Sequence, residues 1–318
     1  MSDLRGALDL GTNSIQLLVA RRTGDGWAAV REWAAVTRLG EGVGSSGLLK
    51  PEAMGRTLDM VGRFLAAARE LFPGLAGVAG GTSALREAGN REVFRAACRE
   101  RFGFLPPVFG GHEEAETTFL GVAGGVPAGE PLLNLDMGGG STEVSAGDRE
   151  QCRFAASLDL GCVRFGERFH LLDRSDVASR QAARDAAREL LAPALAAARE
   201  RLGEVAVRFM ASGGTATTLA ATAQGMEIYD RDRVEGWEIA CDSLGEWADR
   251  LGGMTVAERA ALPGVNEGRA QVLPAGLLIL HEALGCLGAE RLRVTTRGLR
   301  LGMLARLSRG TLAECWQL

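Results

Sequence analysis

The chain has 318 residues, of which 46% are hydrophobic and 24% are charged, and its formal net charge is −4. This length accommodates two domains, each with its own hydrophobic core. The composition is that of a globular protein, and the negative net charge gives no support for a nucleic-acid partner. The longest apolar tract, 272–280, is too short to cross a bilayer, so no membrane partner is expected.

Six cysteines are spread along the chain without CxxC spacing or a zinc-binding pattern. In a chain of this size, such cysteines are typical of reduced and mostly buried thiols, and they predict a cytoplasmic protein. The first strand is expected within a few residues of Met1, which leaves no room for a signal peptide.

The first predicted element is a hairpin in which residues 6–10 and 15–20 flank a Gly-Thr-Asn-Ser turn, with Asp9 near the end of the first strand. Residues 27–39 are predicted to add one or two strands that lead into a Gly-rich segment. That segment is no dinucleotide fingerprint, because Ser45 stands where the third glycine is required and no helix is expected to begin there. A P-loop is also excluded, since the chain has no Gly-Lys-Ser/Thr sequence.

A helix is predicted from Pro51 to about Leu71, followed by a short strand near 75–79. Arg86 lies just beyond that strand, at the end where α/β folds bind ligands. A strand at 107–109 precedes a helix whose first turn carries several carboxylates. Such carboxylates commonly complement the helix dipole, but one directed at a ligand can instead position or deprotonate a water. The pattern alone leaves both interpretations open.

The second hairpin, Leu132–Gly147, reads LLNLDMGGGSTEVSAG. An apolar strand ends at Asp136, three glycines form the turn, and Glu143 follows early in the next strand. Glycines let the backbone approach a ligand closely, and successive backbone N–H groups in such a turn form an anion site. A phosphate in the turn with a divalent cation on the two carboxylates is the natural interpretation, and an ordinary Gly-rich hairpin is the alternative.

The two hairpins are copies of each other at a constant offset of 127 residues. The matched pairs are Asp9 with Asp136, Gly11 with Gly138, Ser14 with Ser141, and Gln16 with Glu143. This repeat predicts a duplicated domain, with two phosphate-binding hairpins facing each other across a cleft.

The second half continues with a strand at 151–157 and a long helix at about 175–201, in which Pro193 predicts a kink or break. A buried strand at 205–210 leads into a Gly-rich turn at Gly213-Gly214-Thr215, which predicts an anion site at a helix N-terminus. The remaining predicted elements are a strand at 233–240, helices at about 243–251, 255–261 and 268–286, a strand at 291–295, and a final helix at 299–318.

Nine segments in the same order resemble the exopolyphosphatase/guanosine-pentaphosphate phosphatase (Ppx/GppA) family almost end to end. They are LDLGTNSI, TRLGEG, TSALREAGN, GGHEEAE, LDMGGGSTE, SLDLGCVR, SGGTATTLAA, GRAQVLPAG and TRGLRLG. The resemblance implies an α/β fold with duplicated actin/Hsp70/sugar-kinase-like (ribonuclease H-like) domains and an interdomain cleft. It implies the short two-domain form, with domains at 1–125 and 126–298 and the final helix, 299–318, packing back on the first.

The resemblance implies an exopolyphosphatase, which removes orthophosphate from the end of inorganic polyphosphate with Mg²⁺ or Mn²⁺ as cofactor. Hydrolysis of guanosine pentaphosphate (pppGpp) by the same chemistry is the alternative. A nucleotide- or alarmone-binding regulator and a phosphotransferase of the sugar-kinase type are further alternatives. A homodimer would be in keeping with the family.

The resemblance also implies roles for individual residues. Glu114 corresponds to the family's proposed catalytic base, Asp136 to a metal ligand, and Glu143 to a residue that acts on the metal or on the nucleophilic water. Asp9, the repeat partner of Asp136, is a further candidate metal ligand. The implied phosphate-binding residues are Gly11, Thr12, Asn13, Ser14, Arg38, Arg86, Gly138, Gly139, Gly140, Ser141, Thr142, Gly213, Gly214, Thr215 and Arg297.

Two residues depart from the family pattern. Gln16 stands where many relatives have a basic residue, and Gln271 stands where an acidic residue is common. Neither belongs to the acid/base set, so an active enzyme is still expected. Arg164 and Arg269 lie in shared segments as well, without an assigned contact.

Overall fold

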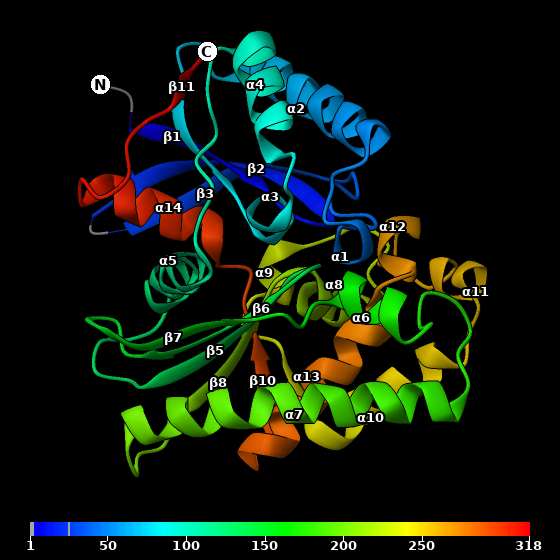
Figure 1. Ribbon diagram of the computed structural model, residues 1–318. Helices are drawn as coiled ribbons and strands as arrows, with labels where there is room; N and C mark the ends of the chain where they lie inside the picture. The colour runs from blue at the N-terminus through cyan, green and yellow to red at the C-terminus, as the bar shows by residue number, and fades with distance from the viewer. Residues whose placement is uncertain (1–2, 25) are drawn as a thin grey trace. The chain divides into compact units, whose positions relative to one another are not determined.

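The computed structural model describes residues 3–24 and 26–318 (Figure 1). The chain divides into two compact units, one formed by Met1–Gly124 together with Leu299–Leu318, the other by Gly125–Gly298. Each unit is built on its own mixed β-sheet. The α/β class predicted from the sequence is confirmed.

The sheet of the first unit has the strand order β11-β4-β1-β2-β3. Strands β1, β2 and β3 form an antiparallel meander, β4 runs parallel to β1, and β11 pairs antiparallel with β4. The strands are β1 (Leu4–Leu10), β2 (Ser14–Thr23), β3 (Gly26–Val36), β4 (Ala76–Gly81) and β11 (Trp316–Gln317).

Alternation along the strands gives this sheet two apolar faces. Leu8 and Leu10 pack in a cluster with α2 and α4, whereas Ala7 and Val78 pack in a separate cluster with α14. The helices of the unit are α1 (Val43–Ser46), α2 (Pro51–Leu71), α3 (Ser83–Glu87), α4 (Arg91–Phe102), α5 (Gly111–Ala123) and α14 (Leu299–Ser308).

The C-terminal segment differs from the prediction of a helix to residue 318. The helix ends at Ser308, and Trp316 begins the edge strand β11. The Trp316 ring lies over Gly6 and Gly77, which face each other on β1 and β4. A Cβ added to either glycine would come within 2.2 Å of the ring. The indole N–H donates to the Val78 carbonyl at 3.0 Å. The two glycines therefore form a slot for the indole, a tertiary contact that helical propensity does not reveal. The strand predicted at 107–109 is reduced to one parallel bridge, between Gly81 and Val108.

The sheet of the second unit has the order β7-β6-β5-β8-β10-β9. Its first four strands repeat the order and directions of β3-β2-β1-β4, and Asp136 faces Glu143 as Asp9 faces Gln16. The duplication inferred from the 127-residue offset is therefore present in the topology. The strands are β5 (Leu132–Met137), β6 (Thr142–Gly147), β7 (Cys152–Leu158), β8 (Arg208–Ser212), β9 (Glu238–Ala240) and β10 (Arg291–Val294).

Eight helices follow in the chain order of this unit: α6 (Cys162–Arg168), α7 (Val177–Leu202), α8 (Gly214–Ala223), α9 (Arg231–Val234), α10 (Cys241–Gly252), α11 (Val256–Ala260), α12 (Glu267–Ala270) and α13 (Leu273–Leu287). The long helix α7 continues through Pro193 instead of breaking there. Pro193 is exposed, while Leu191 and Leu195 on the opposite face are buried. Water can therefore solvate the carbonyl that proline leaves without a donor, and core packing holds the helix together. None of the described helices has the length and apolar character that a bilayer span requires.

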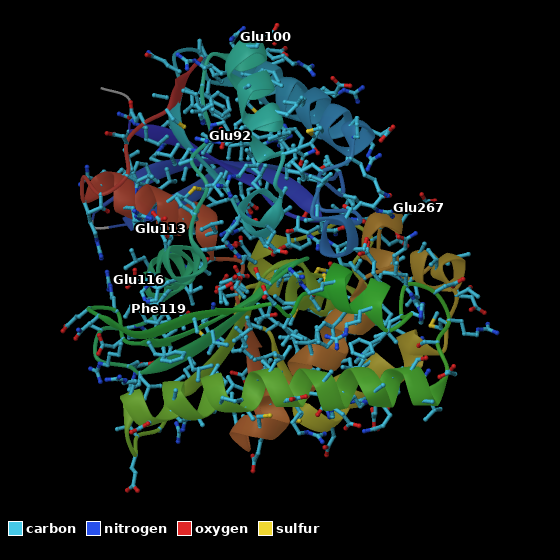
Figure 2. All side chains as sticks on the ribbon, viewed as in Figure 1. Glu92, Glu100, Glu113, Glu116, Phe119 and Glu267 are labelled. Atoms are coloured by element: carbon cyan, nitrogen blue, oxygen red, sulfur yellow. The ribbon has the colours of Figure 1, made fainter. Side chains whose placement is uncertain are left out.

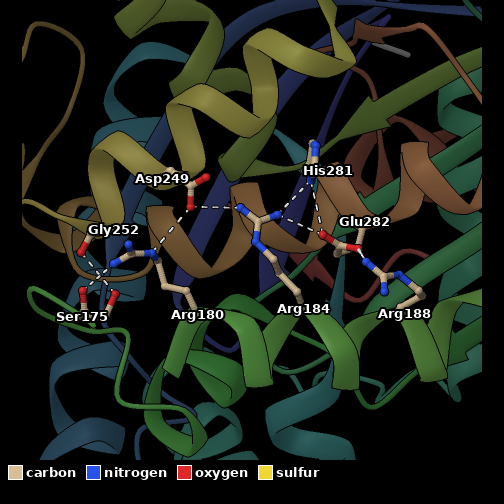
Figure 3. Close-up of polar contacts among 8 residues, drawn as sticks. All are labelled: Ser175, Arg180, Arg184, Arg188, Asp249, Gly252, His281 and Glu282. Atoms are coloured by element: carbon tan, nitrogen blue, oxygen red, sulfur yellow. Dashed lines mark hydrogen bonds and ion pairs between the residues drawn. The ribbon is translucent and has the colours of Figure 1, made fainter. Parts of the chain in front are cut away.

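An ion-pair network joins α7, α10 and α13 (Figure 3). Glu282, which is only 4% exposed, accepts hydrogen bonds from Arg184 at 2.9 Å and Arg188 at 2.7 Å, and Arg184 also reaches Asp249 at 3.1 Å. Burial opposes the charged form of Glu282, but hydrogen bonds from His281, Arg184 and Arg188 outweigh it and lower its pKa to about 2. The carboxylate is therefore charged in the folded protein at neutral pH.

Candidate active site

The first glycine turn, Gly11–Ser14 between β1 and β2, is held in place by hydrogen bonds that its carbonyl groups accept. The Asn13 carbonyl accepts hydrogen bonds from the N–H groups of Thr37 at 3.1 Å and Arg38 at 2.9 Å, and the Thr12 carbonyl accepts one from Gly40 at 2.9 Å. The N–H groups of Thr12 and Asn13 have no hydrogen-bond acceptor in the described ranges. Two successive amides of one tight turn are thus available to an anion.

The Asn13 side chain adds a buried polar group to this turn. The residue is 4% exposed, and neither its amide nitrogen nor its amide oxygen has a hydrogen-bond partner among the described residues. Thr37, whose N–H donates to the Asn13 carbonyl, is 3% exposed. Its hydroxyl also has no hydrogen-bond partner within those ranges. Leaving such a group unsatisfied costs about 1–3 kcal/mol, so buried groups of this kind are typical of sites that bind a polar ligand or ordered water.

The second glycine turn, between β5 and β6, is held by the N-terminus of α6. The Cys162 N–H donates to the Gly138 carbonyl at 3.0 Å, and the Val163 N–H donates to the Gly139 carbonyl at 2.9 Å. Arg164 Nε donates to the Gly140 carbonyl at 2.8 Å. The N–H groups of Gly139 and Gly140 have no acceptor within the described part of the chain. The amides of this turn are therefore available to an anion as well.

Close packing explains the glycine next to this turn and the position of Thr142. A Cβ on Gly161 would lie 2.3 Å from the Gly139 carbonyl oxygen, so α6 can approach the turn only through glycine. Thr142 is fully buried, and its hydroxyl donates to the Leu160 carbonyl. The Thr142 hydroxyl is thus used to hold the turn, although the residue was predicted as a phosphate contact.

Two carboxylates lie on neighbouring strands beside the second turn. Asp136 at the end of β5 faces Glu143 on β6, and Glu143, which is 1% exposed, accepts a hydrogen bond from Ser157 Oγ at 2.8 Å. Oxygen ligands of this kind suit Mg²⁺, which commonly takes one or two protein carboxylates and completes its shell with substrate phosphate and water. No group of three or more His, Cys, Asp or Glu side chains in the described ranges could hold a metal ion. The two carboxylates fit a cation that takes its remaining ligands from a phosphate group and water.

The Gly213 turn adjoins Asp136. Gly213 has a φ of 88°, and a Cβ on it would lie 2.8 Å from Asp136 Oδ1. The next residue, Gly214, begins α8 and lies against the guanidinium of Arg269, with an added Cβ only 2.1 Å from Nη2. Burial lowers the pKa of this arginine, and the nearby Cys162 thiol opposes the shift. No contact was assigned to Arg269 from the sequence. Its place in the shared segment GRAQVLPAG could have indicated a role at the site.

Arg297 lies in a loop that Glu235 fixes. The Glu235 carboxylate accepts hydrogen bonds from Thr295 Oγ1 at 3.0 Å and from the Thr296 N–H at 2.7 Å. Burial lowers the pKa of Arg297; Glu235 opposes this shift, and Arg231 lowers the pKa further. A partly desolvated arginine beside a like charge is a group that a bound anion would stabilise.

Of the three carboxylates at the start of α5, Glu114 alone is buried. Glu114 is 6% exposed, and its carboxylate accepts a hydrogen bond from Arg86 Nη1 at 2.6 Å. Glu113 instead pairs with Arg306 at 2.7 Å, and Glu116 is exposed. Figure 2 labels Glu113 and Glu116 on α5. Arg86, predicted as a phosphate contact, therefore holds the carboxylate that the family resemblance assigns as the base.

Arg38 has an unusual backbone conformation for a residue other than glycine. Its φ is 52°, in the left-handed region, and its guanidinium makes no hydrogen bond or ion pair with any residue that the structure describes. Residues held in this region occur frequently at ligand-binding sites.

The pattern of the Ppx/GppA phosphatase family matches residues 18–309. The chain is 37% identical over 287 residues to exopolyphosphatase 2 of Mycobacterium tuberculosis. The aligned region covers 87% of this chain and 88% of that protein. It is similar to the crystal structure of an exopolyphosphatase from Cytophaga hutchinsonii, with a TM-score of 0.86, 26% identity, and coverage of 96% of this chain and 98% of that one. A crystal structure of the Aquifex aeolicus Ppx/GppA family member gives a TM-score of 0.78 at 25% identity, again with 96% and 98% coverage.

Proposed function

The chain belongs to the Ppx/GppA phosphatase family, and on that premise we propose that it is an exopolyphosphatase. It would hydrolyse the terminal phosphoanhydride bond of inorganic polyphosphate and release orthophosphate. The observation that carries the proposal is the second glycine turn, where the amides of Gly139 and Gly140 adjoin the carboxylates of Asp136 and Glu143. Backbone donors beside paired carboxylates suit a phosphate group that brings a divalent cation with it.

We assign the cation, Mg²⁺ or Mn²⁺, to Asp136 and Glu143. When bound, it would neutralise charge on the phosphate oxygens and orient the reacting phosphoryl group. We also propose Asp9 as an oxygen ligand; its cross-strand partner Gln16 is neutral, so the first turn contributes one carboxylate where the second contributes two.

We propose Glu114 as the general base, which orients and deprotonates the attacking water. The hydrogen bond from Arg86 fixes the position of the carboxylate. A positioned base of this kind typically contributes about 10²–10⁴-fold to the rate. Glu143 is the second proposed catalytic residue, because its carboxylate can act on the metal or on the nucleophilic water.

The remaining proposed contacts bind the phosphate chain. Backbone amides of Thr12, Asn13, Gly139 and Gly140 would donate to phosphate oxygens, with the Gly213–Thr215 turn contributing the N-terminus of α8. Arg38 and Arg297 would provide charge. The proposed contacts that complete this set are Gly11, Ser14, Arg86, Gly138 and Ser141, while Thr142 would support the turn through its hydrogen bond to the Leu160 carbonyl.

We further propose that the protein acts in the cytoplasm, and that its partners are polyphosphate, as substrate, and a second copy of the chain. All six cysteines are free thiols, in keeping with a reducing compartment. A sedimentation measurement would decide between a monomer and a homodimer.

Phosphate release from polyphosphates of defined length, pppGpp and ATP, measured side by side, tests the proposed function. We expect polyphosphate to give the highest kcat/KM. Turnover of pppGpp alone would instead identify a guanosine pentaphosphate phosphohydrolase. Tight binding of pppGpp without phosphate release from any of the three would identify a regulator.

A further inference from the structure

A short segment, Thr37–Glu41, follows β3 and carries the arginine with the left-handed backbone. Three of its N–H groups, those of Thr37, Arg38 and Gly40, donate to the carbonyls of the first glycine turn. The segment also closes on itself, because the Glu41 N–H donates to the Arg38 carbonyl at 3.1 Å. The position of the Arg38 guanidinium therefore depends on how firmly this segment is held.

Arg56 on α2 contacts both ends of this segment. Its Nε donates to the Thr37 carbonyl at 3.2 Å, and its Nη2 donates to Glu41 Oε2 at 3.1 Å. The other carboxylate oxygen of Glu41 accepts a hydrogen bond from Lys50 Nζ at 2.7 Å. The Lys50 hydrogen bond lowers the pKa of Glu41 despite the opposing effect of burial, so Glu41 is charged at neutral pH. The Arg56 guanidinium thus donates a hydrogen bond to each end of the segment. Its planar, forked donor geometry makes this possible, and a lysine lacks that geometry.

An ion pair as exposed as this one ordinarily contributes little to stability. The Arg56 side chain is 47% exposed and that of Glu41 is 38% exposed, so a role in holding the fold together is a poor explanation for the arrangement. The contact with the Thr37 carbonyl has a different consequence. It fixes the residue immediately before Arg38, at the point where the chain enters the left-handed conformation.

We propose that Arg56 is a positioning residue for substrate binding: through the Thr37 carbonyl and the Glu41 carboxylate, it holds Arg38 where its guanidinium binds phosphate oxygens. Arg56 itself does not touch the substrate. The inference rests on the proposed function, because a polyphosphate chain is the anion that Arg38 would bind.

Arg56→Ala should raise the KM for polyphosphate about three- to tenfold and leave kcat within about twofold, because the contact acts on binding and not on the reacting group. Arg63→Ala is the matched control, since Arg63 is an exposed arginine on the same helix without a contact to the segment. It should leave both constants unchanged. Arg56→Lys should fall between wild type and Arg56→Ala, because one ammonium cannot bond both ends of the segment.

A double-mutant cycle with Arg38→Ala separates positioning from a general charge effect. In the Arg38→Ala background, Arg56→Ala should change KM by less than twofold. The same three- to tenfold increase in that background would overturn the inference, because Arg56 would then act independently of Arg38. A fall in kcat with an unchanged KM would overturn it as well.

Amide hydrogen exchange tests the positioning without any substrate. Arg56→Ala should speed exchange of the Thr37, Arg38 and Gly40 amides at least tenfold, and Arg63→Ala should not. Unchanged exchange would overturn the inference even if polyphosphate is hydrolysed. If wild type releases no phosphate from polyphosphate, the proposed function fails, whereas exchange and the affinity for inorganic tripolyphosphate still decide whether Arg56 positions Arg38.

Discussion

The two glycine turns share a backbone path but differ in what supports them and in what lies beside them. The first turn contains Thr12 and Asn13, is held by the amides of an irregular segment, and has Asp9 facing the neutral Gln16. The second turn contains only glycine at the matching positions, is held by the N-terminus of α6, and has Asp136 facing Glu143. Both turns therefore have backbone amides available to a ligand, and of the two only the second has facing carboxylates.

This difference suggests a division of labour. The second unit carries the carboxylate pair suited to a cation, whereas the first carries the buried, Arg86-bonded Glu114 proposed as base. If the division is correct, equivalent substitutions in the two units should have unequal effects.

Glu114→Gln should lower kcat by about 10²–10⁴-fold, because the amide cannot accept a proton from the attacking water. Glu113→Gln is the matched control, since Glu113 is the neighbouring carboxylate and pairs with Arg306. Phosphate release and tripolyphosphate affinity should both be measured. A normal kcat for Glu114→Gln would remove the base assignment, and lost affinity would point to a binding role.

Asp136→Asn should lower turnover more than Asp9→Asn. We expect a loss of about 10²-fold or more for Asp136→Asn, with a raised Mg²⁺ requirement, because a neutral amide replaces one of the two paired carboxylates. Asp9→Asn should cost about tenfold or less, since Asp9 faces a neutral glutamine. A Mg²⁺ titration of phosphate release measures both. Equal losses would argue against the division between the turns.

Glu282→Gln should lower the free energy of unfolding by about 2–3 kcal/mol at pH 7, because it removes the buried charged acceptor that Arg184 and Arg188 share. The folded pKa of about 2 lies below the ordinary value of 4.5. The stabilisation is therefore present above about pH 4.5 and is lost as the pH falls toward 2. Urea unfolding from pH 7 to pH 3 measures this, and the variant should lose less stability than wild type over that range. Parallel pH dependences would contradict the assigned role of Glu282.

Gly161→Ala should destabilise the protein more than Gly40→Ala. The added methyl at position 161 meets the backbone of Gly139 at 2.3 Å, whereas the one at position 40 meets the terminal methyl of Thr12 at the same distance. Backbone cannot move aside as a side chain can, so we expect about 3 kcal/mol for Gly161→Ala and about 1 kcal/mol for Gly40→Ala. Urea unfolding measures the difference, and the reverse order would show that the second turn is the more adaptable one.

The parts of the fold that were predictable from sequence are those that local pattern determines. Turns with an aspartate two residues before a glycine, flanked by apolar residues, marked both hairpins. Pro51 at a helix start marked α2, whose predicted bounds of 51 and 71 match Pro51–Leu71. The family resemblance added the fold class and the identity of the family, both of which are confirmed.

The features that sequence did not reveal depend on contacts between distant segments. Trp316 forms an edge strand because Gly6 and Gly77 leave room for its ring, and Pro193 is accommodated because it faces solvent. The contacts of Arg56 and Arg269 join residues far apart in the chain, so neither spacing nor periodicity indicates them.

Orthophosphate release from inorganic polyphosphate, measured with Mg²⁺ and with a chelator, tests the proposed activity and its metal dependence together. We expect rapid release with Mg²⁺, loss of release with the chelator, and recovery when Mg²⁺ is restored. Release that continues at the same rate in the chelator would contradict the role assigned to Asp136 and Glu143, and no release under either condition would contradict the proposed activity.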